Sequence, residues 1–254
     1  MANKKKPETT IEETTEELTP VELSEMSPEQ IMMMQSGGLQ TVLNLGLFEE
    51  LYLEDIRDRI FYLDSEVKSD VLHTIISQIL RINGMEYGNP NPEDIAPIII
   101  IINSCGGSVP DGLALCDAIN TSRVPVIGIV TGYAYSMAFS ILTQCHMRVG
   151  MPNSSYLFHD GWTCDSNTSS KVRDAARFYE QVDKRINKMI ANRTKFTTEY
   201  LESISRADNY WLADEMKEKG VLDAIIGEDI DIGEIFSFMS EHRTECECDE
   251  CSEK

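Results

Sequence analysis

Apolar and polar positions follow two different periods along the middle of the chain. Short apolar runs of strand length are separated by longer segments whose apolar residues recur at helical spacing. The predicted strands cover residues 59–63, 98–102, 124–130 and 155–158. The predicted helices are one capped by Asp64 and Ser65, which runs to the loop at 84–92, and two further helices at 111–120 and 136–144. This alternation predicts an α/β fold with a mainly parallel sheet.

A long amphipathic helix is predicted over residues 170–194. One stripe of it is apolar and its other faces are charged. A helix of about 25 residues spans roughly 37 Å, which is more than a body of this size needs on one side. We expect it to project and to contact another subunit; the alternative is a helix that lies across its own domain. Residues 208–223 then predict a short strand, a helix and a glycine stop.

The two ends of the chain differ in composition from its centre. Residues 1–26 are polar and rich in glutamate, which predicts a disordered acidic tail. Residues 27–42 predict a short helix and a linker, with Ser27 as the cap and Gly37–Gly38 at the end. The globular domain is predicted over 43–232, and 233–254 form an acidic, cysteine-containing C-terminal tail.

The charge excludes several classes of partner. The formal net charge is −21 over 254 residues, so neither nucleic acid nor an anionic membrane surface is an expected partner. No apolar run approaches the roughly 20 residues that span a bilayer, and the N-terminus lacks a signal-peptide core. We therefore expect a cytoplasmic protein, acting in the host cytoplasm if it is viral. Seven cysteines, an odd number, suit reduced thiols better than a disulfide framework.

Ser136 is the first candidate for chemistry. It follows a near-continuous apolar run that ends at Gly132, and a predicted helix begins at the serine. A serine at a strand-to-helix junction exposes its hydroxyl, and the next backbone N–H, that of Met137, faces the same space. Helix capping is the commoner reason for a serine in this position. A nucleophilic role would require a base and donors for an oxyanion.

Among four histidines, His159 is the best candidate for that base. It ends the strand at 155–158, and active sites of α/β sheets form at the carboxyl ends of strands. His73 lies in a helical stripe, His242 in the C-terminal tail, and His146 at the end of the helix that Ser136 begins. A purely structural role for His159 is the alternative.

The donors of an oxyanion hole have a candidate segment as well. Gly106–Gly107 leaves the end of the buried strand at 98–102, and two glycines let backbone N–H groups face a cleft without side-chain obstruction. The helix that follows adds its positive end. Many strand–helix turns use a glycine pair, so this pattern indicates an oxyanion hole only in combination with Ser136 and His159.

Three ordered segments together resemble the ClpP serine endopeptidase family. They are residues 101–109 (IINSCGGSV), 132–138 (GYAYSMA) and 151–159 (MPNSSYLFH), and the likeness continues to 213–223 (ADEMKEKGVLD). The resemblance covers roughly residues 50–225. It implies Ser136 as nucleophile, His159 as general base and the N–H groups of Gly107 and Met137 as the oxyanion hole. It also implies a ClpP/crotonase-like spiral of β-β-α units with a projecting long helix.

The resemblance extends to assembly and partners. Family members form stacked heptameric rings that enclose their active sites, and the long helix mediates contact between rings. This implies a tetradecamer that cleaves peptides or unfolded proteins, with an AAA+ unfoldase as the partner that supplies them. No cofactor is expected. An N-terminal segment like the family's axial loops, which engage the unfoldase, is hard to recognise in this chain.

The third member of the catalytic group departs from the family pattern. An ungapped match places Ile204 where the family has its triad aspartate, and an isoleucine cannot orient an imidazole. The nearest acid is Asp208, which matches a different acidic position, one tied to subunit contacts. Two hypotheses stay open: a local shift brings Asp208 to His159, or the protein uses a Ser–His dyad.

The C-terminal tail carries one further constellation. His242 and the cysteines at 246, 248 and 251 offer four ligands of the kind that zinc prefers. Their spacing is uncommon for a zinc finger, and no second ligand pair lies at a distance. We therefore predict no metal site and interpret this segment as a flexible acidic tail with free thiols.

Two other functions compete with a peptidase. The first is a ClpP-like ring subunit with a structural or regulatory role and weakened or absent catalysis, which the isoleucine at 204 favours. The second is a crotonase-type acyl-CoA enzyme, which shares the architecture and the backbone oxyanion hole. Such an enzyme would not need the Ser136–His159 pair, and the chain shows no basic cluster for the phosphates of CoA.

Overall fold

A computed structural model describes residues 51–89, 95–161 and 168–242 of the chain. The chain divides into two units, residues 1–53 and 54–254, and nearly all of the described residues belong to the second. The predicted tail at 1–26 and the predicted helix and linker at 27–42 lie outside the described residues. The predicted domain boundaries therefore stay predictions.

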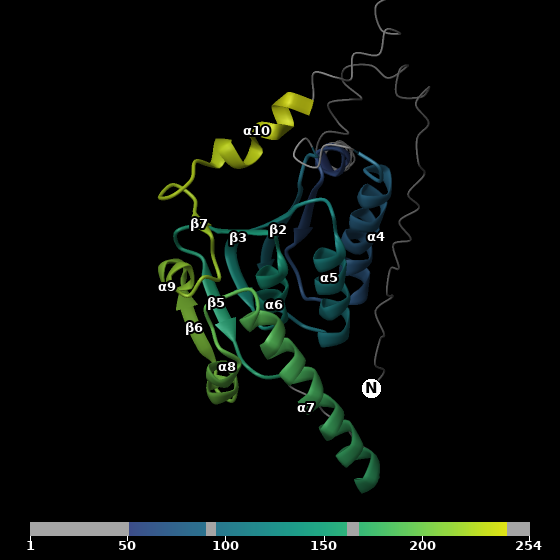
Figure 1. Cartoon of the computed structure of the whole chain (residues 1–254), viewed down its shortest axis with the longest axis vertical. Helices are drawn as coiled ribbons and strands as arrows, with labels where there is room; N and C mark the ends of the chain where they lie inside the picture. Colours follow the sequence, from purple (N-terminus) through teal and green to yellow (C-terminus); the bar gives the residue numbers. More distant parts are fainter. Residues whose placement is uncertain (1–50, 90–94, 162–167, 243–254) are drawn as a thin grey trace, which may run out of the picture. The chain divides into compact units, whose positions relative to one another are not determined.

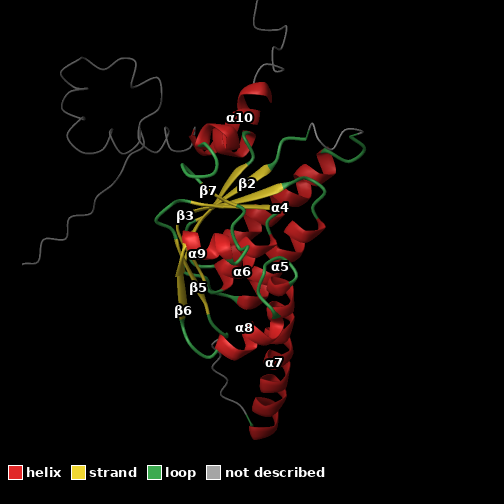
Figure 2. Ribbon diagram, turned by 60° about the vertical axis from the view of Figure 1, so that its left-hand side comes forward, coloured by secondary structure: helices red, strands yellow, loops and turns green. Residues whose placement is uncertain are grey.

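Seven strands form one sheet within the described residues (Figure 2). They are β1 (Ile60–Leu63), β2 (Ile98–Ser104), β3 (Val126–Tyr135), β4 (Met147–Gly150), β5 (Ser155–Phe158), β6 (Asn209–Leu212) and β7 (Ala224–Ile225). The order is β1-β2-β3-β4-β7, and β5 pairs with both β3 and β6. All pairs are parallel except β5 with β6. The predicted α/β fold with a mainly parallel sheet is confirmed.

The helices alternate with the strands as expected (Figure 1). They are α4 (Ser69–Met85), α5 (Val109–Thr121), α6 (Met137–Gln144), α7 (Ser169–Ala191), α8 (Thr198–Ile204), α9 (Ala213–Glu218) and α10 (Ile232–His242). The predicted cap of the first of these was wrong, because α4 begins at Ser69 and not after Asp64 and Ser65. The chain stays extended there: Val67 donates its N–H to the carbonyl of Gly106, and Ser108 donates to the carbonyl of Val67, both at 2.8 Å.

Strand β3 is longer than predicted and pairs with three strands: with β2 on one edge, and with β4 and then β5 on the other. Its first half, Val126–Val130, pairs with β2 and, over Ile127–Val130, with β4. Its second half, Tyr133–Tyr135, pairs with β5. Since Ser136 follows Tyr135 directly, the pairing with β5 brings the end of β3 beside the strand that leads into His159.

The alternating residues of the central strands bury both faces of the sheet. Ile98, Ile100 and Ile102 of β2 join the large core that includes α4, α5 and α6. Ile99 faces the other way, in a smaller cluster that includes Ile235 of α10. Helix α10 was not predicted. It occupies the first half of the segment interpreted as a tail, and its burial of Ile235 covers the second face of the sheet (Figure 2).

Helix α7 has two unlike halves (Figure 1). Its C-terminal half is anchored, with Ile186, Asn187 and Ile190 buried. Its N-terminal half extends beyond the rest of the unit and exposes three large apolar side chains, Val172, Phe178 and Tyr179. The helix therefore projects, as its length predicts.

The described cysteines and helices bear on two further expectations. Cys105, Cys116 and Cys145 are free thiols. Burial raises the pKa of Cys116, and it raises that of Cys145 to about 12, so both stay protonated at neutral pH. Cys246, Cys248 and Cys251, which the zinc alternative requires, lie outside the described residues. No helix in the described ranges is both long and apolar enough to cross a membrane.

Candidate active site

The turn of residues 135–137, here the Ser136 turn, joins β3 to α6 in a backbone conformation that is rare outside glycine. Ser136 has φ 54° and ψ −119°. Its N–H donates to the carbonyl of Leu157 in β5 at 2.8 Å, and its carbonyl accepts the N–H of Ser140 at 3.2 Å. The hydroxyl makes no capping bond to the helix. Strained backbone of this kind is typical of nucleophile turns, because it directs the side chain away from the helix.

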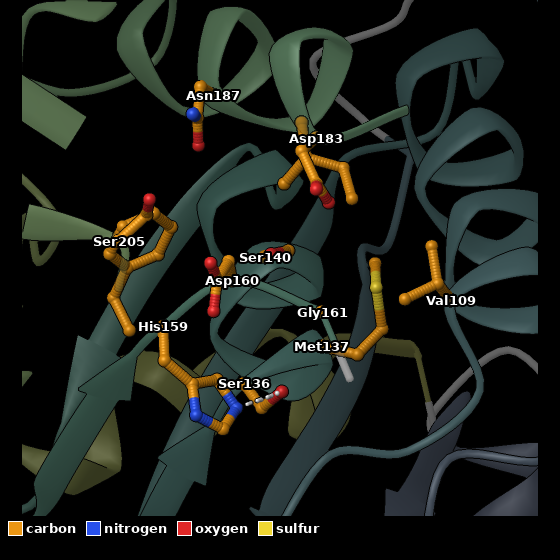
Figure 3. Close-up of a pocket in the computed structure, with 12 residues that line it drawn as sticks. Val109, Ser136, Met137, Ser140, His159, Asp160, Gly161, Asp183, Asn187 and Ser205 are labelled. Carbon is orange, nitrogen blue, oxygen red and sulfur yellow. Dashed lines mark hydrogen bonds between the residues drawn. The ribbon is translucent and has the colours of Figure 1, made fainter. Parts of the chain in front are cut away.

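Ser136, His159 and Asp208 form one chain of hydrogen bonds. Ser136 Oγ lies 2.9 Å from Nε2 of His159 (Figure 3), and Nδ1 of His159 lies 2.9 Å from Oδ1 of Asp208. The side chain of Asp208 is 59% exposed and that of His159 is 32% exposed. The sequence left open whether an acid reaches the imidazole. The structure brings Asp208 to it, while Ile204 packs against the hydrophobic core.

The loop of residues 205–208, here the Asp208 loop, is held by hydrogen bonds to the neighbouring strand. Asp160 donates its N–H to the carbonyl of Ser205 at 2.7 Å. Nδ2 of Asn209 lies within hydrogen-bonding distance of three carbonyls, those of Phe158, Ile204 and Ala207, at 3.2, 2.8 and 2.7 Å. Asn209 thus ties the loop to the residue before His159. Sequence reasoning missed Asn209, although its position directly after the candidate acid is a usable signal.

Two backbone N–H groups at and beside the Ser136 turn are free to donate. Those of Gly107 and Met137 have no hydrogen-bond acceptor within the described residues. Gly106 (φ +88°) leaves no room for a side chain, because a Cβ there would lie 2.5 Å from the carbonyl oxygen of Tyr135 and 2.9 Å from the N–H nitrogen of Met137. Gly107 (φ +149°) is equally restricted, since its Cβ would lie 2.5 Å from the Val67 carbonyl oxygen. Gly106 therefore allows close approach to the Ser136 turn, and Gly107 allows close approach to the extended segment at Val67.

The other histidines do not compete for Ser136. Nδ1 of His146 accepts the N–H of Val126 at 3.0 Å. Burial, and then the nearby Arg193, lower the pKa of His146, so its ring is neutral and does not act as a cation at the end of α6. His73 is exposed on α4. Of the histidine side chains that the structure describes, His159 alone contacts Ser136.

A pocket opens beside the hydroxyl (Figure 3). It lies between the Ser136 turn and the anchored half of α7. Its lining comprises Val109, Ser136, Met137, Ser140, Phe158, His159, Asp160, Gly161, Asp183, Ile186, Asn187 and Ser205. The pKa of Asp183 is raised by burial and by the nearby carboxylates of Asp160 and Glu180. The pocket thus lies next to the hydroxyl, and its lining contains the carboxylates of Asp160 and Asp183 but no lysine or arginine.

Comparison with known proteins identifies the class and then the family. A serine and a histidine are hydrogen-bonded at the carboxyl ends of adjacent parallel strands of an α/β fold, an arrangement that serine hydrolases use. The family model described as Clp protease matches residues 48–229, which is most of the chain. The chain belongs to the Clp protease family. The match covers β1 to β7 and ends before α10.

Proposed function

We propose that this protein is a serine endopeptidase of the ClpP type. The observation that carries the proposal is the hydrogen-bonded chain from Ser136 through His159 to Asp208. A serine hydroxyl is a weak nucleophile at neutral pH unless a base accepts its proton. The imidazole of His159 lies at the right distance to be that base, and Asp208 fixes the ring orientation.

The geometry supports an acyl-enzyme mechanism. Ser136 Oγ transfers its proton to Nε2 of His159 and attacks the peptide carbonyl carbon. The resulting oxyanion accepts hydrogen bonds from the N–H groups of Gly107 and Met137. The C–N bond breaks as His159 protonates the leaving amine, and an ester on Ser136 remains. Water, deprotonated by His159, attacks this ester and releases the acid, which restores Ser136.

The proposal includes assembly into rings, with a tetradecamer as the full particle and an AAA+ unfoldase as the supplier of unfolded substrate. The exposed apolar side chains Val172, Phe178 and Tyr179 on the projecting half of α7 support it. An exposed apolar patch on a projecting helix is typical of a protein–protein contact. We propose the cytoplasm as the site of action.

Activity-based labelling tests the catalytic part of this proposal. A fluorophosphonate probe should modify the full-length protein, and Ser136→Ala should abolish the labelling. Peptide hydrolysis should fall by about 10⁶ in kcat. Ser203→Ala, which removes an exposed hydroxyl from α8, is the matched control and should label as the wild type does. Equal labelling of Ser136→Ala would contradict the proposal. A ring-sized particle that neither labels nor hydrolyses any peptide would favour the inactive ring subunit.

A further inference from the structure

The pocket beside Ser136 combines apolar walls with a polar, acidic end. Val109, Met137 and Ile186 provide apolar surface from three different helices. Asp183 and Asn187 lie one turn apart on α7 and point toward the space above the Ser136 turn, where Asp160 also lies (Figure 3). A side chain with an apolar stem and a cationic tip matches such a division, since lysine and arginine bury their methylene groups and keep the charge in a polar environment.

The two carboxylates lack a cationic partner. Within the described residues, neither Asp160 nor Asp183 forms a salt bridge, whereas acids elsewhere in the unit do, as Asp223 does with Arg148 at 2.5 Å. Asp183 is half-buried, and Asp160 and Glu180 add negative charge around it. A half-buried carboxylate in a negative environment is unfavourable by itself, and a bound cation would relieve it.

Asn187 provides an independent observation. It is 6% exposed, its side-chain amide makes no hydrogen bond within the described residues, and its polar atoms stay accessible rather than enclosed in the core. A buried amide normally satisfies its donors and acceptor within the protein. Here it lines the pocket, so its free oxygen and nitrogen face the space that a ligand would occupy. The amide oxygen can accept a hydrogen bond from an ammonium or guanidinium group.

We propose that this pocket selects a lysine or arginine side chain at the substrate residue that supplies the carbonyl attacked by Ser136. This inference rests on the proposed peptidase function and adds the substrate class. Asp183 is its principal specificity-determining residue, Asp160 the exposed second charge, and Asn187 the hydrogen-bond acceptor. The excess of acidic residues over the whole chain, 43 against 22 basic ones, favours the approach of cationic substrates as well.

The experiment compares fluorogenic peptides that differ only at the residue before the scissile bond: arginine, lysine, norleucine and glutamate. For the full-length protein, kcat/KM for arginine and lysine should exceed that for norleucine by about tenfold or more. Asp183→Asn keeps the shape of the side chain, and it should lower the arginine-to-norleucine ratio by about tenfold. Asp160→Asn should lower the ratio less, because Asp160 is exposed. Asp174→Asn removes the same charge from the exposed half of α7 and should leave the ratio unchanged.

The possible results distinguish a failure of the cation pocket from a failure of the proposed peptidase function. Hydrolysis that prefers norleucine, with a ratio that Asp183→Asn leaves unchanged, would overturn the cation pocket and leave the peptidase standing. An equal fall of the ratio in Asp174→Asn would overturn it too, because it would trace the preference to overall charge. If no peptide is cleaved and no serine probe reacts, the peptidase function fails and the inference fails with it.

Discussion

The Ser136 turn and the Asp208 loop lie on opposite sides of the same imidazole, yet they are built in different ways. The Ser136 turn lies over the buried core and is determined by backbone close to it: a positive φ, a glycine that cannot carry a side chain, and a bond to β5. The Asp208 loop is exposed, and its carboxylate contacts His159 from the solvent side. It owes its position to hydrogen bonds from Asn209 and Asp160.

Because of this difference, we expect the two sides of the candidate triad to tolerate amino-acid substitution to different degrees. A close backbone approach cannot adapt by small movements, because packed interiors leave no space for them. An exposed carboxylate is screened by water, so its contribution to orienting the imidazole is smaller than that of a buried one. Substitutions on the Ser136 side should therefore have larger effects than substitutions on the Asp208 side.

Among substitutions that leave Ser136 and His159 in place, Gly106→Ala should have the largest effect. Its Cβ would meet the carbonyl oxygen of Tyr135 and the N–H nitrogen of Met137, so it would displace the candidate oxyanion hole and lower kcat by about 10³. The positive φ should also lower the free energy of unfolding by about 1–3 kcal/mol. Peptide hydrolysis and denaturant unfolding measure the two effects. Gly84→Ala is the control: nothing lies near its Cβ in α4, and neither quantity should fall. Full activity in Gly106→Ala would contradict the claim that the backbone beside the Ser136 turn cannot adapt to a side chain.

Asp208→Asn should have a smaller effect, a loss of about 10² in kcat. Loss of a buried triad acid lowers kcat by about 10⁴, and solvent exposure of Asp208 reduces its share. Steady-state kinetics on a short peptide measures the change. Asp117→Asn, an exposed acid of α5 away from the pocket, should be neutral. A loss below threefold in Asp208→Asn would instead favour the Ser–His dyad.

Asn209→Ala should lower kcat by about tenfold with little change in KM. Asn209 contacts no reacting atom and acts by positioning the loop, so its effect must pass through Asp208. A double-mutant cycle tests this, since Asn209→Ala should add little to the loss already caused by Asp208→Asn. Additive losses in the double variant would show that Asn209 works independently of Asp208.

Mild acid should lower the free energy of unfolding through His146, an exposed histidine that follows α6. The pKa of this histidine is lowered in the folded protein, so the unfolded chain binds a proton more readily. The stability that depends on a neutral ring is present above the unfolded pKa of about 6.5 and is lost as the pH falls toward the lower folded value. Thermal unfolding between pH 8 and pH 5 measures this fall. His146→Asn, whose Oδ1 replaces Nδ1 as the acceptor of the Val126 N–H, should show a shallower dependence than the wild type.

The two regions also explain what the sequence could predict. Ser136, the glycine pair and His159 stand at the ends of strongly apolar strands, so their proximity follows from parallel pairing alone. Asp208 stayed one of two hypotheses, because its position depends on where α8 ends and on the three carbonyls that Asn209 reaches. Neither the end of α8 nor the hydrogen bonds of Asn209 can be inferred from the spacing of apolar residues. Strand β4 (MRVG) was not predicted because an arginine and a glycine interrupt its apolar residues, and helix α8 was not predicted because its seven residues bury only Leu201 and so show no apolar stripe.

Helix α10 determines where the chain can be truncated without exposing its core. The family match ends at residue 229, but Ile235 is needed to cover the second face of the sheet, where it joins Ile99, Ile129 and Val149. A chain trimmed at the family boundary would expose these side chains to water and become prone to aggregation. The segment that aligns with the family is thus shorter than the segment that folds, and boundaries for expression belong beyond residue 242.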